Sequence, residues 1–457
     1  MAEHWDSTED TDARWEPIPD DVWSVEDSGF GDERAAGSAG RAESDEWLEP
    51  ARTMVRPRPV EMGPQPAARS YGEDPWPDDA GGAYEPRESR VSRGRAWSGG
   101  PSSRQPRVSR VRAERAPRGA RHGCLSFLLW LVMLAVVVVM ALRCLPADLA
   151  NGRLVPEAVS FVPWLFAPIV LCLVLALLWR RRLLAVVAAA ALAAMLWWHA
   201  GFLLPREGVS DAAVATAQAS ADPSDGVARV MTLNTAHGAA SAEEVVALVR
   251  EKNVEVLCLQ ELTDDFLSEL SSAGLYDLLP YYVISDEASA ISNGGRNGIW
   301  TLAPMDNVSG NLLPIDTSSM PAGTVQIGGL DVRVVSVHPN SPVRGAQDLW
   351  DEGLGVIGSL SEYDHTYLVM GDFNSTWDHA RFRELLGTDF VDAGSEAGEG
   401  FHMTYPSGTL ARIELPSLVE IDHIVYARDS GITVSELETA EVSGTDHRAL
   451  LGVLEVA

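Results

Sequence analysis

The sequence predicts an α/β domain over residues 226–457, preceded by three transmembrane helices and a disordered N-terminal tail. Three observations predict this order. Residues 1–122 contain no long apolar run, three long runs without Asp, Glu, Lys or Arg lie between residues 123 and 205, and strand-like and helix-like segments alternate from residue 226 onwards. A chain of 457 residues is long enough to form such separate parts.

The tail, residues 1–122, is rich in Glu, Asp, Pro, Gly, Ser and Arg. We expect it to be disordered, because it has too little apolar surface to offset the entropy lost when a backbone is ordered. Its first fifty residues carry sixteen acidic and three basic side chains, whereas residues 101–121 carry seven arginines and one acidic residue. Its scattered tryptophans fit a partner-binding segment or a solvated linker. The linker is the simpler interpretation, and the sequence names no partner.

The three apolar runs cover residues 124–142, 158–179 and 183–204. Each is close to the ~20 residues with which an α-helix crosses a ~30 Å hydrocarbon core. The first run is not a signal peptide, because more than a hundred residues precede it. Buried helices of a globular domain are the alternative interpretation, but three such runs in close succession favour membrane spans.

Arginines predict the orientation of these spans. Three arginines precede the first span between residues 115 and 121, and residues 180–182 are an all-arginine turn between the second and third spans. Loops rich in arginine stay in the cytoplasm. The N-terminus is therefore expected in the cytoplasm and the C-terminal domain outside the cell. The loop between the first and second spans is nearly neutral, and Arg143 at its edge is a minor exception to this rule. Residues 206–225 are predicted to be a flexible stalk in this multi-pass protein of the cell membrane.

The pattern of apolar residues after residue 226 predicts an α/β domain with no internal repeat. The predicted strands cover residues 230–234, 254–259, 332–337, 367–370, 421–426 and 450–454, and the predicted helices cover residues 241–250, 343–360 and 378–386. The first helix begins with a capping box, Ser241 followed three residues later by Glu244.

Polar side chains lie at the ends of these strands, at Asn234, Glu261, His338, Asp372, Asp422, Asp446 and His447. Strand ends at one edge of an α/β sheet face a common crevice, so these side chains can converge there. Two carboxylates about 4 Å apart repel each other by about 4 kcal/mol at an effective dielectric constant of 20, and a cation removes that repulsion. Because oxygen ligands dominate, the cation expected is Mg²⁺ or Mn²⁺.

In their order along the chain, these residues resemble the motifs of the endonuclease/exonuclease/phosphatase superfamily, which includes deoxyribonuclease I and sphingomyelinases. The motifs cover residues 232–235, 259–261, 337–339, 371–374, 421–424 and 445–448. The resemblance implies a four-layer α/β sandwich, in which two packed mixed β-sheets are flanked by helices. It also implies a metal-dependent hydrolase that acts on phosphoester bonds.

The resemblance implies a metal site on Glu261. Glu261 would be the principal ligand of the Mg²⁺ or Mn²⁺ ion, and Asn234 and Asp446 would assist it directly or through water. The ion would polarise the phosphoryl group and offset the charge that develops on it.

The resemblance also implies the catalytic residues. Asp372 would orient and deprotonate the attacking water, and Asn374 would hold that water or a phosphate oxygen. His447, oriented by Asp422, would stabilise the transition state or exchange a proton. His338 would protonate the leaving oxygen.

Each role has a structural alternative. His338 can be a turn residue after a strand, Asp372 can cap the next helix, and Asn234 can satisfy a backbone group at the end of a strand. His402 and Tyr405 are expected on a loop beside the cleft, where substrate contact and loop packing are equally open.

Two positions depart from the pattern of many relatives. Glu420 stands where an arginine often precedes the Ile-Asp-His motif, and residues 301–302 stand where a Ser-Arg pair is common. Arginines that contact phosphate are therefore missing unless Arg296 or Arg448 replaces them. His423 is not included in the site, because other rings occur at this position in the superfamily.

Charge guides the choice of substrate. Residues 226–457 carry eleven basic and thirty-five acidic side chains, a net charge near −24, whereas proteins that bind nucleic acids use basic side chains to contact phosphates. A small or lipid-borne phosphoester is therefore favoured. The layout resembles the teicoplanin-resistance membrane proteins of actinomycetes, which suggests phospholipids or lipid-linked cell-wall precursors. The alternatives are a nuclease for extracellular DNA and a catalytically silent domain of a membrane sensor.

Overall fold

The computed structural model describes residues 123–457 except 153, 205, 286–294, 344, 411–412 and 415. The predicted disordered tail, residues 1–122, lies outside the described residues.

In the described part of the chain, seven helices lie between residues 123 and 203. They are α1 (Gly123–Arg143), α2 (Ala147–Ala150), α3 (Val155–Ser160), the 3₁₀ helix η2 (Val162–Leu165), α4 (Phe166–Leu178), α5 (Arg182–Trp198) and α6 (Ala200–Leu203). One of these, from Cys124 to Arg143, is long and apolar enough to cross a membrane. The two later apolar stretches, Val162–Leu178 and Arg182–Trp198, are shorter. A helix of 17 residues is about 25 Å long. The prediction of three spans is thus supported in part, and the second and third spans stay a prediction.

The apolar helices are apolar on their inner and their outer surfaces. Met133 of α1, Ile169 and Cys172 of α4, and Ala188 and Met195 of α5 are buried in one hydrophobic cluster. Large apolar side chains also remain exposed along these helices. In the rest of the described chain, outside residues 125–204, the exposed large apolar side chains are only Tyr281, Tyr282, Val308, Val343 and Tyr363. A patch of this size on a soluble protein would be unusual.

The predicted stalk contains a helix, α7 (Asp211–Ala219). Ser210 caps this helix, because its hydroxyl accepts a hydrogen bond from the Ala213 amide, and it donates another to Glu455 Oε1 at 2.7 Å. Ala213 and Ala217 pack against Val227 and Val453 of the domain. This part of the segment is therefore a helix held against the domain and not an extended flexible linker.

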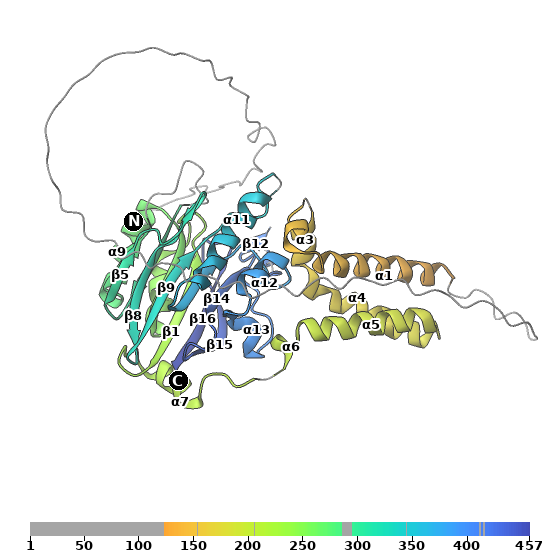
Figure 1. The fold of residues 1–457 in the computed structure, drawn as a ribbon, viewed down its shortest axis with the longest axis horizontal. Coiled ribbons are helices and arrows are strands. Elements are labelled where there is room, and N and C mark those ends of the chain that lie inside the picture. Colours follow the sequence, from red (N-terminus) through yellow and green to blue (C-terminus); the bar gives the residue numbers. More distant parts are fainter. Residues whose placement is uncertain are drawn as a thin grey trace, which may run out of the picture. The chain divides into compact units, whose positions relative to one another are not determined.

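The domain contains two six-stranded mixed sheets (Figure 1). The first has the order β15-β16-β1-β2-β4-β3, with strands β1 (Val227–Asn234), β2 (Val254–Leu262), β3 (Tyr281–Ile284), β4 (Arg296–Thr301), β15 (Ile432–Glu441) and β16 (Arg448–Val456). The second has the order β11-β14-β10-β9-β8-β5, with strands β5 (Met305–Ser309), β8 (Ala322–Ile327), β9 (Leu330–Val337), β10 (Thr366–Asp372), β11 (Phe390–Asp392) and β14 (Asp422–Ala427). Two short hairpins, β6 (Pro314–Ile315) with β7 (Ser318–Ser319) and β12 (Thr409–Leu410) with β13 (Ile413–Glu414), complete the strands of the described part.

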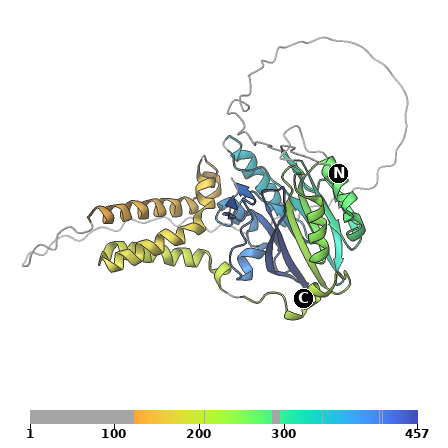
Figure 2. The ribbon, with the colours of Figure 1, turned by 180° about the vertical axis from the view of Figure 1, so that it is seen from behind.

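Helices cover the outer faces of the two sheets, as both views show (Figures 1 and 2). The domain helices are α8 (Ala242–Glu251), α9 (Asp264–Ala273), α10 (Leu275–Leu278), α11 (Gln347–Gly358), η3 (Ser359–Glu362), α12 (Ala380–Leu386) and α13 (Ala393–Ala397). Alternate residues of one strand face different layers: Val230 packs between the sheets, whereas Met231 packs against α8 and α9. Trp350 of α11 and Phe382 of α12 pack on the second sheet. The predicted four-layer α/β sandwich is confirmed.

Candidate active site

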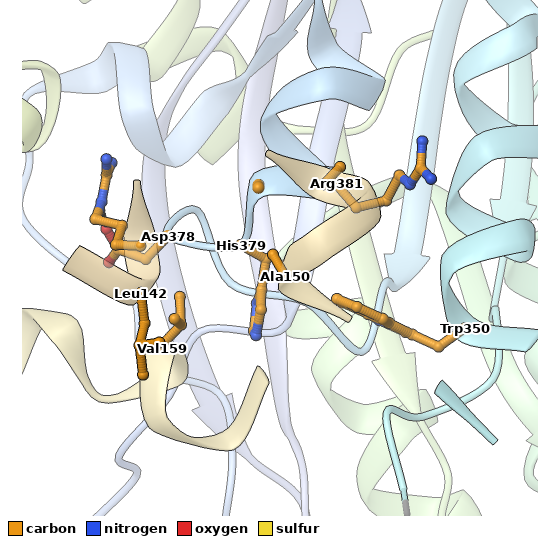
Figure 3. Close-up of a pocket in the computed structure, with 10 residues that line it drawn as sticks. Leu142, Ala150, Val159, Trp350, Asp378, His379 and Arg381 are labelled. Atoms are coloured by element: carbon orange, nitrogen blue, oxygen red, sulfur yellow. Dashed lines mark hydrogen bonds and ion pairs between the residues drawn. The ribbon is translucent and has the colours of Figure 1, made fainter. Parts of the chain in front are cut away.

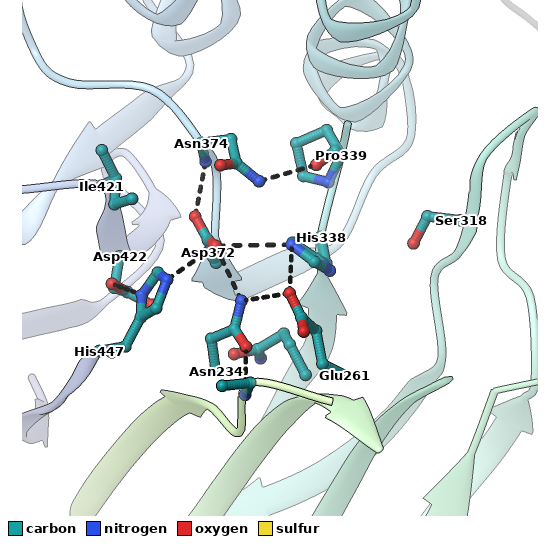
Figure 4. Close-up of polar contacts among 12 residues, drawn as sticks. Asn234, Glu261, Ser318, His338, Pro339, Asp372, Asn374, Ile421, Asp422 and His447 are labelled. Carbon is teal, nitrogen blue, oxygen red and sulfur yellow. Dashed lines mark hydrogen bonds and ion pairs between the residues drawn. The ribbon is translucent and has the colours of Figure 1, made fainter. Parts of the chain in front are cut away.

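Strand direction explains why the predicted residues meet at one edge of the sandwich. β1 runs parallel to β2, and β9 runs parallel to β10, so these four strands end at the same edge. β14 is antiparallel to β10, and β16 is antiparallel to β1, so these two strands begin there. The side chains brought together are Asn234, Glu261, His338, Asp372, Asn374, Asp422 and His447 (Figure 4).

Asn234 connects carboxylates from both sheets at the centre of this group. Its side-chain Nδ2 donates hydrogen bonds to Glu261 Oε1 and to Asp372 Oδ2, each at 3.0 Å. Its Oδ1 accepts a hydrogen bond from the Ala236 amide at 2.9 Å, which fixes the orientation of the side chain. Beneath it, Gln260 also joins the sheets, because its Nε2 lies 3.1 Å from Ser336 Oγ.

A local distortion of β2 places Glu261. The pairing of β2 with β4 shifts between Leu259 and Leu262, and Glu261 has a φ of +60°. Bulges of this kind redirect a side chain, and a positive φ is costly for a residue other than glycine, so both are typical of functional positions. Gly295 leaves room for the distortion, since a Cβ atom there would lie 2.8 Å from the Leu262 carbonyl oxygen. The Glu261 carboxylate also accepts a hydrogen bond from the His237 amide at 2.8 Å.

Asp372 and Asn374 form the turn after β10. The Asn374 amide donates to Asp372 Oδ1 at 2.7 Å, and Asn374 Nδ2 donates to the Pro339 carbonyl at 3.1 Å. Burial alone would raise the pKa of Asp372. The charge of His447 and the hydrogen bond and charge of His338 outweigh that effect and lower the pKa to about 2.

His447 and Asp422 form a carboxylate–imidazole pair. His447 Nδ1 lies 2.8 Å from Asp422 Oδ2, and His447 Nε2 lies 3.7 Å from Asp372 Oδ2. Burial opposes protonation of the imidazole, but the charges of Asp422 and Asp372 raise the pKa of His447 above its usual range. The ring of Tyr405 packs beside it, with 5.0 Å between ring centroids.

His338 lies between the two carboxylates that Asn234 bridges. Its Nε2 is 3.5 Å from Asp372 Oδ2 and 3.7 Å from Glu261 Oε1. Burial would lower the pKa of His338, but the hydrogen bond and charge of Asp372 and the charge of Glu261 raise it. The two carboxylates thus favour the protonated form of this imidazole, which would partly balance their negative charge.

The donors present suit a hard divalent cation. Glu261, Asp372 and Asp422 provide carboxylate oxygens within one small region, and oxygen donors are the preferred ligands of Mg²⁺ and Mn²⁺. By distance alone, Asp372, Asp422 and His447 also form a possible ligand trio, with atoms within 4.8 Å of one another. The Nδ1 atom of His447 already bonds to Asp422, however, and this trio is buried. Glu261, whose side chain is 14% exposed, is the more accessible ligand.

Asp446 takes part in the site through its charge, which contributes to raising the pKa of His447 after the larger effects of burial, Asp422 and Asp372. Its residue is exposed on the turn before β16, and its backbone carbonyl accepts a hydrogen bond from the Ser407 amide at 2.6 Å. Neither Asn234 nor Glu261 has its carboxylate as a hydrogen-bond partner among the described contacts. A direct ligand role for Asp446 therefore has less support than the role of Glu261.

The two arginines considered as replacements already have partners. Arg296 forms an ion pair with Asp264, and Arg448 forms one with Glu441. Glu420 is buried and accepts a hydrogen bond from the His402 amide at 3.2 Å, and burial raises the pKa of its carboxyl group to about 8. Both arginines thus pair with exposed acidic side chains, and a phosphate contact by either of them stays a prediction.

His423 has a structural role, consistent with its omission from the predicted site. Its Nδ1 bonds to Asp392 Oδ1 at 2.9 Å and its Nε2 to the Ser375 carbonyl at 2.8 Å. Both ring nitrogens are therefore used inside the protein. Gln260 belongs to the motif at residues 259–261, but its role as a bridge between the sheets was not predicted, because its partner Ser336 is distant in sequence. The contact of the His237 amide with Glu261 was also not predicted, because it involves a backbone atom.

Comparison with known proteins shows what the domain is similar to. The sequence profile of the endonuclease/exonuclease/phosphatase family matches residues 231–447. Solved structures with a similar fold include D. rerio TDP2 complexed with a single-strand DNA product (15% identity, 51% of this chain and 100% of that chain, TM-score 0.41). They also include sphingomyelinase C from Streptomyces griseocarneus (16% identity, 50% of this chain and 99% of that chain, TM-score 0.37) and the human nocturnin catalytic domain (16% identity, 51% and 95%, TM-score 0.38). No curated protein matches this chain.

Proposed function

The domain that contains residues 231–447 belongs to the endonuclease/exonuclease/phosphatase family of metal-dependent phosphoester hydrolases, and from this premise we propose a more specific activity. The protein hydrolyses a phosphomonoester or phosphodiester at the outer surface of the cell membrane with Mg²⁺ or Mn²⁺ bound. The substrate is a lipid-linked or small molecule.

The proposed metal site is centred on Glu261. Its carboxylate is partly accessible and is held by hydrogen bonds from Asn234 Nδ2 and the His237 amide. Asn234 and, through water, Asp446 would complete the protein ligands. A bound Mg²⁺ or Mn²⁺ ion polarises a phosphoryl oxygen and offsets developing negative charge.

Asp372 is the proposed acceptor for the attacking water. Its lowered pKa keeps the carboxylate ionised at neutral pH, so it can accept a hydrogen bond from the water and orient it toward phosphorus. The Asn374 amide holds Asp372 Oδ1, which leaves Oδ2 directed at the centre of the site. Asn374 itself would contact the same water or a phosphate oxygen.

The two histidines have different proposed roles: His447 stabilises the developing charge, and His338 protonates the leaving group. The carboxylate of Asp422 fixes His447 through Nδ1, so that Nε2–H is available to a phosphoryl oxygen. His338 lies between Glu261 and Asp372, which raise its pKa, and is the proposed donor of a proton to the leaving oxygen.

Charge and anchoring favour a substrate at the membrane over DNA. The net charge near −24 over residues 226–457 repels a polyanion. A domain attached to apolar helices meets molecules of the membrane surface at a high effective concentration. Phospholipids and lipid-linked cell-wall precursors are therefore the proposed substrates, and an extracellular nuclease or a catalytically silent sensor domain are the alternatives.

The observation that carries the proposal is the direct contact of Asn234 with Glu261 and Asp372, which joins the predicted metal ligand to the predicted base. The test uses the full chain in detergent with bis-p-nitrophenyl phosphate. We expect Mg²⁺-dependent hydrolysis that EDTA abolishes. Glu261→Ala should lower kcat/KM at least about a hundredfold, because several kcal/mol of stabilisation by the metal is lost.

The matched control is Asp306→Asn, which removes an exposed carboxylate on the edge strand β5 and should leave the rate unchanged. Absence of turnover on any phosphoester, with the metal bound, would favour the sensor. Efficient nicking of plasmid DNA at physiological salt would favour the nuclease.

A further inference from the structure

The turn that carries Asp372 and Asn374 continues into a segment that the apolar helices hold. Asp378 is buried four residues after Asn374, and its carboxylate contacts two residues from the ends of those helices. Arg143, the last residue of α1, forms an ion pair with Asp378 Oδ1, and His199, directly after α5, lies with Nε2 3.1 Å from Oδ2. A buried carboxylate with two such partners is strongly destabilising when one partner is lost.

His379 makes a second connection between this segment and the helices. The Thr376 amide donates a hydrogen bond to its Nδ1 at 2.8 Å, so Nδ1 is an acceptor and the proton is on Nε2. Nε2 donates to the Pro156 carbonyl of α3 at 2.9 Å. One neutral imidazole thus joins the catalytic segment on one side to the connection between α1 and α4 on the other.

The ends of the two parts also fit closely. Arg383 Nη2 donates to the Arg143 carbonyl at 3.0 Å, so a domain side chain caps the C-terminal end of α1. A cavity of only about 10 Å³ remains between Leu142, Val159, Trp350 and His379 (Figure 3). That volume holds one water molecule at most, so the contact leaves almost no free space around His379.

Only a few residues of the chain separate this contact from the catalytic groups. The Asn374 carbonyl accepts from Trp350 Nε1 at 3.1 Å, and the Ser375 carbonyl contacts His423. The Asn374 amide in turn holds Asp372 Oδ1. A shift of Asp378 or His379 therefore reaches Asp372 through a chain of residues with little freedom to absorb it.

We propose that the ends of the apolar helices position the catalytic turn, and that Asp378 and His379 are positioning residues that transmit this support to Asp372 and Asn374. The apolar part is then a component of the active-site scaffold in addition to an anchor. The alternative is that the same contacts only attach the domain to the apolar helices and leave catalysis unaffected. The inference rests on the proposed function for its kinetic readout.

Two substitutions of His379 separate the alternatives in the full chain. His379→Asn keeps an acceptor for the Thr376 amide but loses the donor to Pro156, whereas His379→Gln keeps a donor but loses the acceptor. We expect His379→Asn to lower kcat for bis-p-nitrophenyl phosphate about tenfold with KM within twofold of the wild type, because misplacement of a catalytic group affects the chemical step. Asp378→Asn should give the same split.

Hydrogen exchange of residues 372–386 provides a readout independent of activity. Exchange should rise in His379→Asn and Asp378→Asn. Arg143→Gln changes only the helix side of the contact and should reproduce both effects. It takes the place of Asp378→Asn if that variant does not fold. Arg206→Ala is the control, because its ion pair with Glu396 also joins the helix side to the domain but involves no residue of the segment.

Unchanged kcat and unchanged exchange in His379→Asn, Asp378→Asn and Arg143→Gln would overturn the inference. A loss in His379→Gln alone would also overturn it, since the bond within the segment would then be the important one. If the wild-type chain hydrolyses no phosphoester, the proposed function fails, and the exchange data alone decide whether the helices support the turn.

Discussion

Asn234 offsets the repulsion between the carboxylates of Glu261 and Asp372. Glu261 Oε1 and Asp372 Oδ2 both lie 3.0 Å from its Nδ2, and one amide group donates to both. On the other side, the carboxylates favour protonation of His338, because the hydrogen bond and charge of Asp372 and the charge of Glu261 outweigh the effect of burial on its pKa. Glu261, whose side chain is 14% exposed, remains accessible enough to take part in binding a cation.

This arrangement predicts a specific response to Asn234→Asp. The substitution replaces the shared donor by a third carboxylate and should destabilise the protein by about 3 kcal/mol in EDTA. Mg²⁺ should restore part of that loss, because a cation offsets the repulsion. Thermal unfolding of the full chain with EDTA and with Mg²⁺ measures both effects. Asn234→Ala loses the donor without adding charge, and an equal response to Mg²⁺ in both variants would contradict the explanation.

His379 predicts a dependence of stability on pH. Burial lowers its pKa to about 4, and the nearby charge of Asp378 favours protonation while that of Arg383 opposes it. The unfolded chain binds the proton below pH ~6.5 and the folded chain only near pH 4. Stability from this group is therefore complete above pH ~6.5 and falls as the pH drops toward 4, by up to about 3 kcal/mol.

His379→Gln removes the titrating group, so its unfolding midpoint should fall less than that of the wild type between pH 7 and pH 4.5. The difference between the two pH profiles isolates His379 from the other acid-sensitive groups. Parallel profiles would show that His379 does not titrate as its burial requires.

At the scale of elements, the pairing of β9 with β10 depends on one glycine. Gly371 has a φ of +154°, and a Cβ atom there would lie 2.0 Å from the Val337 carbonyl oxygen. The close approach brings the end of β9, and therefore His338, next to Asp372. The motif glycine before Asp372 thus serves sheet geometry.

Gly371→Ala should consequently destabilise the protein by about 4 kcal/mol or more, since backbone atoms must move in a packed sheet. Gly329→Ala is the matched control: its φ is +85°, but nothing lies within 4 Å of the added Cβ, so only backbone strain of about 1 kcal/mol is expected. Chemical denaturation of both variants measures the difference. Equal losses would mean that the contact with Val337 relaxes easily.

Sequence patterns predicted the elements that carry the site better than those that surround it. The predicted strands before Asn234 and Asp372 are observed, because continuous apolar runs identify strands buried on both faces. β4, β8 and β15 were not predicted, because their sequences contain no continuous apolar run of the kind that identified the other strands. The predicted helix over residues 343–360 begins only at Gln347.

Long-range contacts were the features that no local pattern could reveal. The exposed position of Asp446 depends on the turn before β16, and the contacts of Asp378 depend on residues more than 170 positions away. Residues 206–225 have a polar composition typical of linkers, yet two alanines of α7 find an apolar surface on the domain. Packing against a distant partner overrode the local signal in each case.

At the scale of the whole molecule, one chain combines two surfaces of opposite chemical character, one apolar and one charged. The helices between residues 125 and 204 expose apolar side chains, and the domain carries a strong negative charge. The first surface is suited to lipid and the second to water. Contacts through Arg143, His199 and His379 connect them, so the domain has a defined attachment at its catalytic edge.

The number of crossings decides what this attachment means, and parity makes it testable. One or three crossings place residue 457 on the outer side when the N-terminus is cytoplasmic, whereas two crossings leave it inside. The arginine turn at residues 180–182 distinguishes one from three, because only three crossings place this turn in the cytoplasm. The number of crossings is open because helices of about 25 Å are shorter than the hydrocarbon core, which is ~30 Å thick.

We expect a reporter fused at Ala457 to be active outside the cell and a reporter inserted at Arg181 to be active only in the cytoplasm. Snorkelling of the flanking arginines, together with α6 beyond α5, can extend the short helices to the interfaces. Outer activity at both positions would establish a single span, with α4 and α5 lying at the outer surface. Cytoplasmic activity at Ala457 would remove the extracellular substrates proposed here, because the catalytic edge would then face only molecules of the inner leaflet and the cytosol.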